Sequence, residues 1–98
     1  MDIIKEVNGN EMDVQLVGRL DTVTSADLEK EVKDQLDGVE KLVYDFENLE
    51  YVSSAGLRVL LACQKIMNKQ GEMIVKNVET DIMEILEITG FTSVFKFA

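Results

Sequence analysis

The sequence contains no histidine, and this absence removes whole classes of catalytic site. Serine and cysteine hydrolases as usually built need an imidazole to accept the proton of the nucleophile, so Ser-His-Asp and Cys-His arrangements are excluded. Most zinc sites are excluded as well, because only one cysteine is present to accompany the carboxylates. We therefore expect a protein that is not an enzyme and that holds neither a metal ion nor another cofactor.

Cysteine and long apolar runs are also scarce. The single cysteine, Cys63, cannot form a disulfide within the chain, which suits a reducing cytoplasm. The longest apolar run, residues 59–63, is far too short to insert across a membrane. The N-terminus has no basic segment followed by a long apolar one, so we expect no signal peptide and a cytoplasmic location.

Basic residues are few: 10 Lys and Arg stand against 19 Asp and Glu, for a net charge of −9. This balance argues against a nucleic-acid surface, which needs clustered positive charge, and it disfavours adsorption to anionic lipid. It favours solubility, and it permits docking onto a basic partner. The 98 residues are expected to form one domain, residues 1–98, and a monomer, because small signalling interfaces are often transient.

The alternation of apolar and polar residues predicts the strands. Residues 3–7 and 12–18 flank the turn signal Asn8-Gly9-Asn10, so they should form an antiparallel hairpin. Further strands are expected at residues 41–46, 73–75 and 94–97. Residues 19–23 and 47–52 are expected to be connecting segments.

Three helices are expected between these strands. Thr24-Ser25-Ala26-Asp27 has the form of a capping box, and the apolar spacing that follows predicts a helix ending at Gly38. A second helix covers about residues 55–70, and a third runs over about residues 80–89 to a stop at Gly90. Strands that alternate with helices favour parallel pairing through right-handed crossovers, so the fold class is α/β with a mixed sheet.

The segment Ser53-Ser54-Ala55-Gly56-Leu57 lies where a loop turns into the second helix. Backbone N–H groups at a helix start are unpaired and carry partial positive charge, so a serine there can cap the helix or hold a phosphate. From the residues alone, Ser54 is an ordinary cap or first-turn residue or a phosphorylation switch. Gly56 permits either close approach of a partner or tight packing of helix on sheet.

Three stretches carry a family resemblance: residues 46–57, Gly18-Arg19-Leu20-Asp21 before a helix, and Gly71-Glu72-Met73 opening a strand. They resemble the STAS domain, which is shared by sulfate transporters and anti-sigma-factor antagonists. The resemblance covers essentially the whole chain, and the length is similar to that of a stand-alone antagonist. It implies a single STAS-like domain with an N-terminal hairpin and helices from β-α-β crossovers.

The resemblance also implies a function. An antagonist of this family binds an anti-sigma factor that is also a serine kinase, and this binding frees a sigma factor. The kinase phosphorylates a serine at the start of the second main helix and so ends the binding, and a serine phosphatase restores it. The implied partners are therefore an anti-sigma factor with serine protein kinase activity and a serine phosphatase.

Aligned on Gly56, the phosphorylated serine of the family falls on Ser54 and its loop aspartate on Asp21. The family often has an acid before the acceptor, where this chain has Ser53, so Ser53 is a rival acceptor. Arg58 lies one turn from the switch and could pair with a phosphate. The partner-binding residues implied by the resemblance are Asp21, Thr22, Thr24, Ser53, Ser54, Gly56, Leu57 and Arg58.

Two other functions stay open at this point. The chain could be a STAS interaction module that is not phosphorylated, in a transporter complex or a stress-signalling scaffold, where Ser54 would be only a cap. It could also bind a small ligand such as a nucleotide or a lipid, which would need a pocket that a domain of this size has little room to form.

Overall fold

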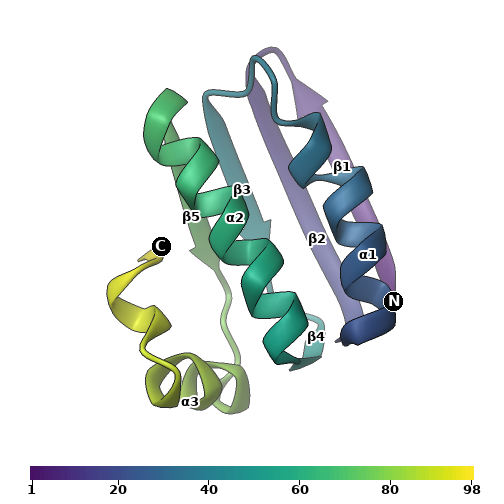
Figure 1. The fold of residues 1–98 in the computed structure, drawn as a ribbon, viewed down its shortest axis with the longest axis vertical. Helices are drawn as coiled ribbons and strands as arrows, with labels where there is room; N and C mark the ends of the chain where they lie inside the picture. The colour runs from purple at the N-terminus through teal and green to yellow at the C-terminus, as the bar shows by residue number, and fades with distance from the viewer.

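The computed structural model describes residues 1–98 and places helices against one face of a six-stranded sheet (Figure 1). The strands are β1 (Asp2–Asn8), β2 (Glu11–Leu20), β3 (Lys41–Asp45), β4 (Leu49–Val52), β5 (Glu72–Lys76) and β6 (Lys96–Phe97). The helices are α1 (Thr22–Glu31), α2 (Ser54–Gln70) and α3 (Thr80–Ile88), with 3-10 turns at Lys33–Gln35 and Phe91–Ser93.

The sheet has the order β1-β2-β3-β5-β6, and β4 pairs separately with β2. β1 and β2 form the predicted antiparallel hairpin, while β3, β4, β5 and β6 all pair in parallel. The predicted α/β class with a mixed sheet and an N-terminal hairpin is therefore confirmed. Figure 1 shows α1 and α2 lying side by side across the sheet, with α3 at its lower end beside the start of α2.

The length of β2 allows it to serve two partners. Its first half pairs with β3, and its last residues, 18–20, pair with β4 with an irregularity between Gly18 and Arg19. The prediction of a loop over residues 19–23 was wrong, since β2 continues to Leu20, and β4 was not predicted at all. A four-residue strand carries too short an alternation to be distinguished from a loop by its sequence.

The core lies between the sheet and the helices. Met12, Val14 and Leu16 alternate along β2 and are buried, as the period of two along a strand requires. From the helices, Leu28 of α1 and Leu60 of α2 join the same apolar cluster. This packing fixes the relative positions of the two helix starts, which both lie at the lower end of the molecule in Figure 1.

The start of α1 differs from the prediction. Asp21, not Thr24, is the N-cap, and the capping box is formed by Asp21 with Thr24 rather than by Thr24 with Asp27. Because β2 runs directly into the helix, the first capping residue after the strand is Asp21, and Thr24 already lies in the first turn. The helix ends at Glu31 with Val32 as its C-cap, and only a 3-10 turn follows, so it stops before Gly38.

The C-terminal elements follow the predictions more closely. Gly90 has a φ of 80° and ends α3 in the left-handed conformation that glycine adopts readily. The last strand is shorter than expected because residues that precede it form a 3-10 turn, with the rings of Phe91 and Phe95 5.3 Å apart. None of the helices has the length and apolar character that a membrane span requires.

Candidate functional site

Two chain segments meet where β2 and β4 end. Because these strands are parallel neighbours, the residues that follow them leave the sheet at the same edge. The Ser53 N–H donates a hydrogen bond of 2.8 Å to the Leu20 carbonyl and so holds the two segments together. Asp21 and Ser53 therefore lie at adjacent helix starts, one at α1 and the other at α2.

The two serines of the motif have different environments. Ser53 is the N-cap of α2: its backbone is extended, and its Oγ accepts a hydrogen bond of 3.2 Å from the Gly56 N–H. Ser54 is the first residue of the helix and is exposed, and its hydroxyl makes no hydrogen bond to another protein group. The hydroxyl of Ser53 is thus engaged in the fold, whereas the hydroxyl of Ser54 is accessible from solvent.

Asp21 is held rigidly at the start of α1. Its Oδ1 accepts hydrogen bonds from the N–H groups of Val23 (3.0 Å) and Thr24 (2.9 Å), and its own N–H donates to Thr24 Oγ1 at 2.8 Å. The hydrogen bond from the Thr24 backbone is the main reason that the pKa of Asp21 is lowered. Asp21 therefore presents a fixed negative charge beside the start of α2.

Gly56 and Leu57 are not surface residues. Both are buried, and a Cβ added to Gly56 would lie 2.6 Å from Cγ of Leu20. Gly56 thus permits close packing of α2 on the end of β2, which is the second of its two predicted roles. The burial of Leu57 leaves its side chain little surface for a partner, and the predicted partner contacts of Gly56 and Leu57 stay predictions.

Arg58 and Thr22 lie on the opposite walls of a groove between α1 and α2. Arg58 is exposed and follows Ser54 by four residues, a spacing that puts both on one face of the helix. The groove has a volume of about 340 Å³, and its lining is mixed, with Val59 among the apolar residues and Glu29 and Lys33 among the charged ones. Pairing of Arg58 with a phosphate on Ser54 stays a prediction.

The sequence analysis did not predict a contact between Arg19 and Tyr51, which lie on β2 and β4 just before the two helix starts. The guanidinium carbon of Arg19 lies 4.3 Å from the ring centre of Tyr51, and the two residues face each other in the pairing of β2 with β4. This is a cation–π contact between two exposed side chains. Only a prediction of β4 and of its register could have found it, and the short strand gave no such signal.

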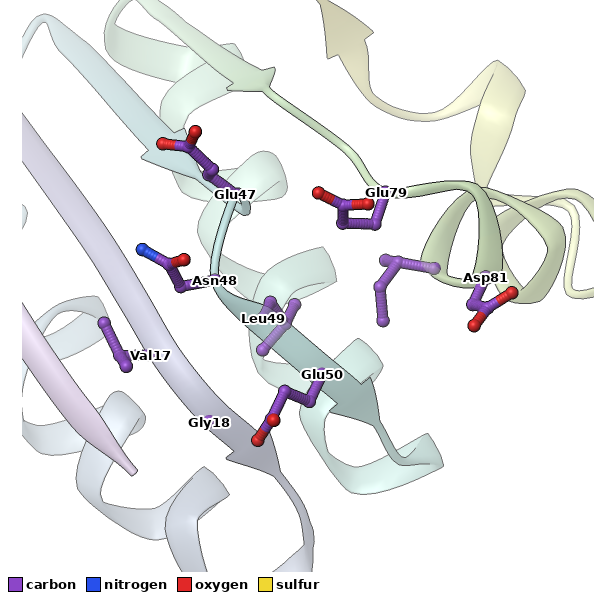
Figure 2. A pocket seen from close by; sticks show the side chains of 9 residues that line it. Val17, Gly18, Glu47, Asn48, Leu49, Glu50, Glu79 and Asp81 are labelled. Carbon is purple, nitrogen blue, oxygen red and sulfur yellow. The ribbon is translucent and has the colours of Figure 1, made fainter.

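The largest hollow of the molecule opens between β4 and the start of α3. It has a volume of about 550 Å³, and its lining contains four carboxylates and no Lys or Arg. Figure 2 shows the carboxylates of Glu50 and Asp81 directed away from each other, with Leu49 next to Glu50 on β4. No group of acids in the protein is arranged to hold a metal ion. The negative lining disfavours nucleotides and anionic lipid headgroups, which were predicted alternatives.

Comparison with known proteins gives a consistent result for the whole chain. The STAS domain model matches residues 2–98. BtrV of Bordetella bronchiseptica, named as an anti-sigma factor antagonist, is 38% identical over 85 residues, which are 85% of this chain and 73% of the relative. The anti-sigma F factor antagonist of Paenibacillus polymyxa is 32% identical over 80 residues, 79% of this chain and 68% of the relative.

Solved structures share the fold. A Mycobacterium paratuberculosis anti-sigma factor antagonist superimposes with a TM-score of 0.86 at 24% identity, covering 98% of this chain and 83% of the other. The Bacillus cell fate determinant SpoIIAA in its phosphorylated form gives 0.77 at 18% identity, covering 99% and 91%. With the family match over nearly every residue and relatives above 30% identity, the chain belongs to the STAS domain family.

Proposed function

We propose that this STAS domain is an anti-sigma-factor antagonist controlled by phosphorylation of Ser54. It binds an anti-sigma factor that is also a serine kinase, so a sigma factor is released. Phosphorylation of Ser54 ends the binding, and a serine phosphatase restores it. The main support for the proposal is Ser54 itself: it is exposed, its hydroxyl has no hydrogen-bond partner in the fold, and it lies where the starts of α1 and α2 are adjacent. The names of the sequence relatives support the antagonist function.

A phosphate on Ser54 is compatible with the fold. It adds about −2 charge and three acceptor oxygens at the first position of α2, where the helix dipole favours negative charge. Arg58, four residues further along the same face, is available to pair with it. The modification is thus expected to leave the domain folded and to act on the partner, through added bulk and charge beside the fixed carboxylate of Asp21.

Ser53 is the weaker acceptor on structural grounds. Its Oγ caps α2, and the residue is half-buried. As an acceptor of phosphate, this oxygen would first have to give up its hydrogen bond with the Gly56 N–H, which the hydroxyl of Ser54 does not have to do. The domain is proposed to act by exchanging partners in the cytoplasm, where sigma factors work, and not by catalysis.

The first test is a kinase assay. The purified protein is incubated with ATP, magnesium and the serine-kinase anti-sigma factors of its host, and the phosphate is located by mass spectrometry. We expect one phosphate on Ser54, none on the Ser54→Ala variant, and normal labelling of Ser53→Ala. Phosphate found on Ser53 instead would support control by phosphorylation but would make Ser53 the acceptor.

The second test measures binding without the kinase reaction. Ser54→Asp is expected to weaken binding to the anti-sigma factor while the melting temperature stays close to that of the unmodified protein. An aspartate variant that binds normally, together with no phosphorylation by any host kinase, would contradict the switch. It would favour a STAS module that is not phosphorylated, in a transporter complex or a signalling scaffold.

A further inference from the structure

The sheet carries helices on one face only. Met12, Val14 and Leu16 of β2 point to that face and pack with α1 and α2, which Figure 1 shows on the same side of the sheet. Successive side chains of a strand point to opposite faces, so the residues between these three point to the other face, here called the open face. The register gives one row of the open face from β1 to β6: Glu6, Asp13, Val43, Ile74 and Lys96.

The centre of the open face is apolar. Val43 is buried, at 8% exposure, and Ile74 beside it is half-buried, although no helix lies over them. With their neighbours they form the hydrophobic runs 42–44 in β3 and 73–75 in β5. Parallel strands with such continuous runs are typical of sheets that are covered on both faces. Two hollows, of about 270 and 310 Å³, adjoin Val43, so the centre has room for side chains of a second layer.

The charges of the open face are divided between its two halves. The half formed by β1 and the start of β2 carries acids and no Lys or Arg: Asp2, Glu6, Glu11 and Asp13. The other half carries three lysines and two acids, and of these Lys96 forms an ion pair with Glu72 at 3.1 Å. Lys41 and Lys76 have no ion-pair partner in the protein. An acidic half and free cations on one face allow it to pair with a second copy of itself.

The symmetry of such a pair follows from the order of the strands. A two-fold axis along β3, the middle strand of the order β1-β2-β3-β5-β6, reverses that order, so the acidic half of each copy lies over the lysine half of the other. Aligned sheets cross at about 30°, and over the roughly 7 Å between rows this moves the second sheet by about one strand. Lys41 has Glu11 on one side in its row and Glu72 on the other, so either direction puts it over a carboxylate of the other copy.

The size of the open face limits the strength of this contact. Five strands about 4.8 Å apart and about five residues long cover roughly 20 by 17 Å. Two faces of that size bury less than the roughly 1,200 Å² of stable complexes, which is the range of weak and transient contacts. The net charge of −9 on each copy also opposes association until salt screens it. A monomer in dilute solution and a dimer at high concentration are therefore expected.

We propose that the open face is a weak dimer interface whose occupant is a second copy of this chain, with Val43 and Ile74 at its centre and Lys41 paired with carboxylates of the other copy. The proposal does not rest on the antagonist function. The open face lies on the opposite side of the sheet from α1 and α2, so the dimer leaves the helix starts and Ser54 uncovered.

Sedimentation equilibrium of the full chain tests the dimer. In about 0.15 M NaCl, the average mass should rise toward twice that of the monomer as the protein concentration increases from roughly 10 µM to 1 mM. Ile74→Lys should weaken association by at least about tenfold, because it places one unpaired charge from each copy at the apolar centre. Ile88→Lys is the matched control: Ile88 is 85% exposed on α3 and is not part of the open face, so this variant should associate like the parent.

Exchanging charges tests the proposed orientation without changing the apolar centre. Lys41→Glu makes every charge in its row negative, and the double variant Glu11→Lys, Glu72→Lys makes every charge in that row positive. Each of the two should stay monomeric, because like charges then face each other across the interface. An equal mixture of the two should dimerise like the parent, because opposite charges face each other again.

Three results would overturn the proposal. One is a parent protein that stays monomeric up to roughly 1 mM. Another is a dimer that Lys41→Glu leaves unchanged, which would indicate a different surface such as the edge strand β1. The third is a mixture of the charge variants that stays monomeric while the parent dimerises and circular dichroism shows both variants to be folded. None of these results bears on the phosphorylation of Ser54, so the proposed antagonist function stands or fails separately.

Discussion

Replacing each serine of the motif by alanine should separate the structural serine from the accessible one. Ser53→Ala removes the oxygen that accepts from the Gly56 N–H, so one N–H at the start of α2 loses its partner within the protein. Ser54→Ala removes an exposed hydroxyl that has no partner in the fold. The two neighbouring substitutions are chemically identical, which makes each one the control of the other.

The expected size of the effect follows from the geometry of the cap. Loss of a serine cap costs about 0.5–2 kcal/mol of unfolding free energy. The Ser53 bond is 3.2 Å long, at the upper limit of ordinary N–H···O distances, so we expect the lower half of that range, about 0.5–1 kcal/mol. In a domain of this size that corresponds to a fall in melting temperature of roughly 3–6 °C. Ser54→Ala should stay within about 0.5 kcal/mol of the parent.

Urea and thermal unfolding followed by circular dichroism measure both variants. Ser53→Asp serves as a rescue, because aspartate is as good a cap as serine and should restore most of the loss. The reasoning is refuted if Ser54→Ala is the more destabilising of the two, or if Ser53→Asp unfolds as easily as Ser53→Ala. Either result would mean that Ser54, not Ser53, caps the helix, and the case for Ser54 as the accessible acceptor would lose its structural basis.

Three further predictions concern the core and the ionisable groups. Gly56→Ala should lower the unfolding free energy by about 1–2 kcal/mol, because the cost of crowding against Leu20 exceeds the gain in helix propensity. Calorimetry should find the affinity for the partner unchanged at temperatures where the variant is folded. Burial raises the pKa of Cys63 from 9.0 to about 11, so the folded state keeps a proton that the unfolded chain releases. The free energy of unfolding should therefore fall as pH rises from 9.0 to about 11, and it should fall less steeply in Cys63→Ala. The thiol of the folded protein should also react slowly with iodoacetamide at neutral pH. Because the pKa of Asp21 is lowered in the folded state, its carboxylate stabilises the fold at pH values above 3.8, the pKa of the unfolded chain, and this stabilisation is lost as pH falls through the lower pKa of the folded state. Asp21→Asn keeps an oxygen that can cap the helix but cannot titrate, so its unfolding free energy should lack this part of the pH dependence in acid.

Local patterns accounted for much of this fold. The hairpin turn at Asn8-Gly9-Asn10, the strands either side of it and the stop of α3 at Gly90 were all predicted, because each depends on residues close together in sequence. The errors lie where a distant segment changes the outcome. β2 extends to Leu20 because β4 is there to pair with it, and this extension moves the cap of α1 back to Asp21.

The sequence by itself determined the family, the α/β class and the position of the segment Ser53–Leu57 at a helix start, since a motif of adjacent residues between a strand and a helix needs no knowledge of the rest of the chain. Tertiary structure alone decided which side chains of that segment face solvent. Packing on Leu20 removes Gly56 and Leu57 from the surface, and the parallel pairing of β2 with β4 brings Arg19 onto Tyr51. The physical reason is that burial and register depend on contacts between residues more than thirty positions apart, which no local spacing encodes.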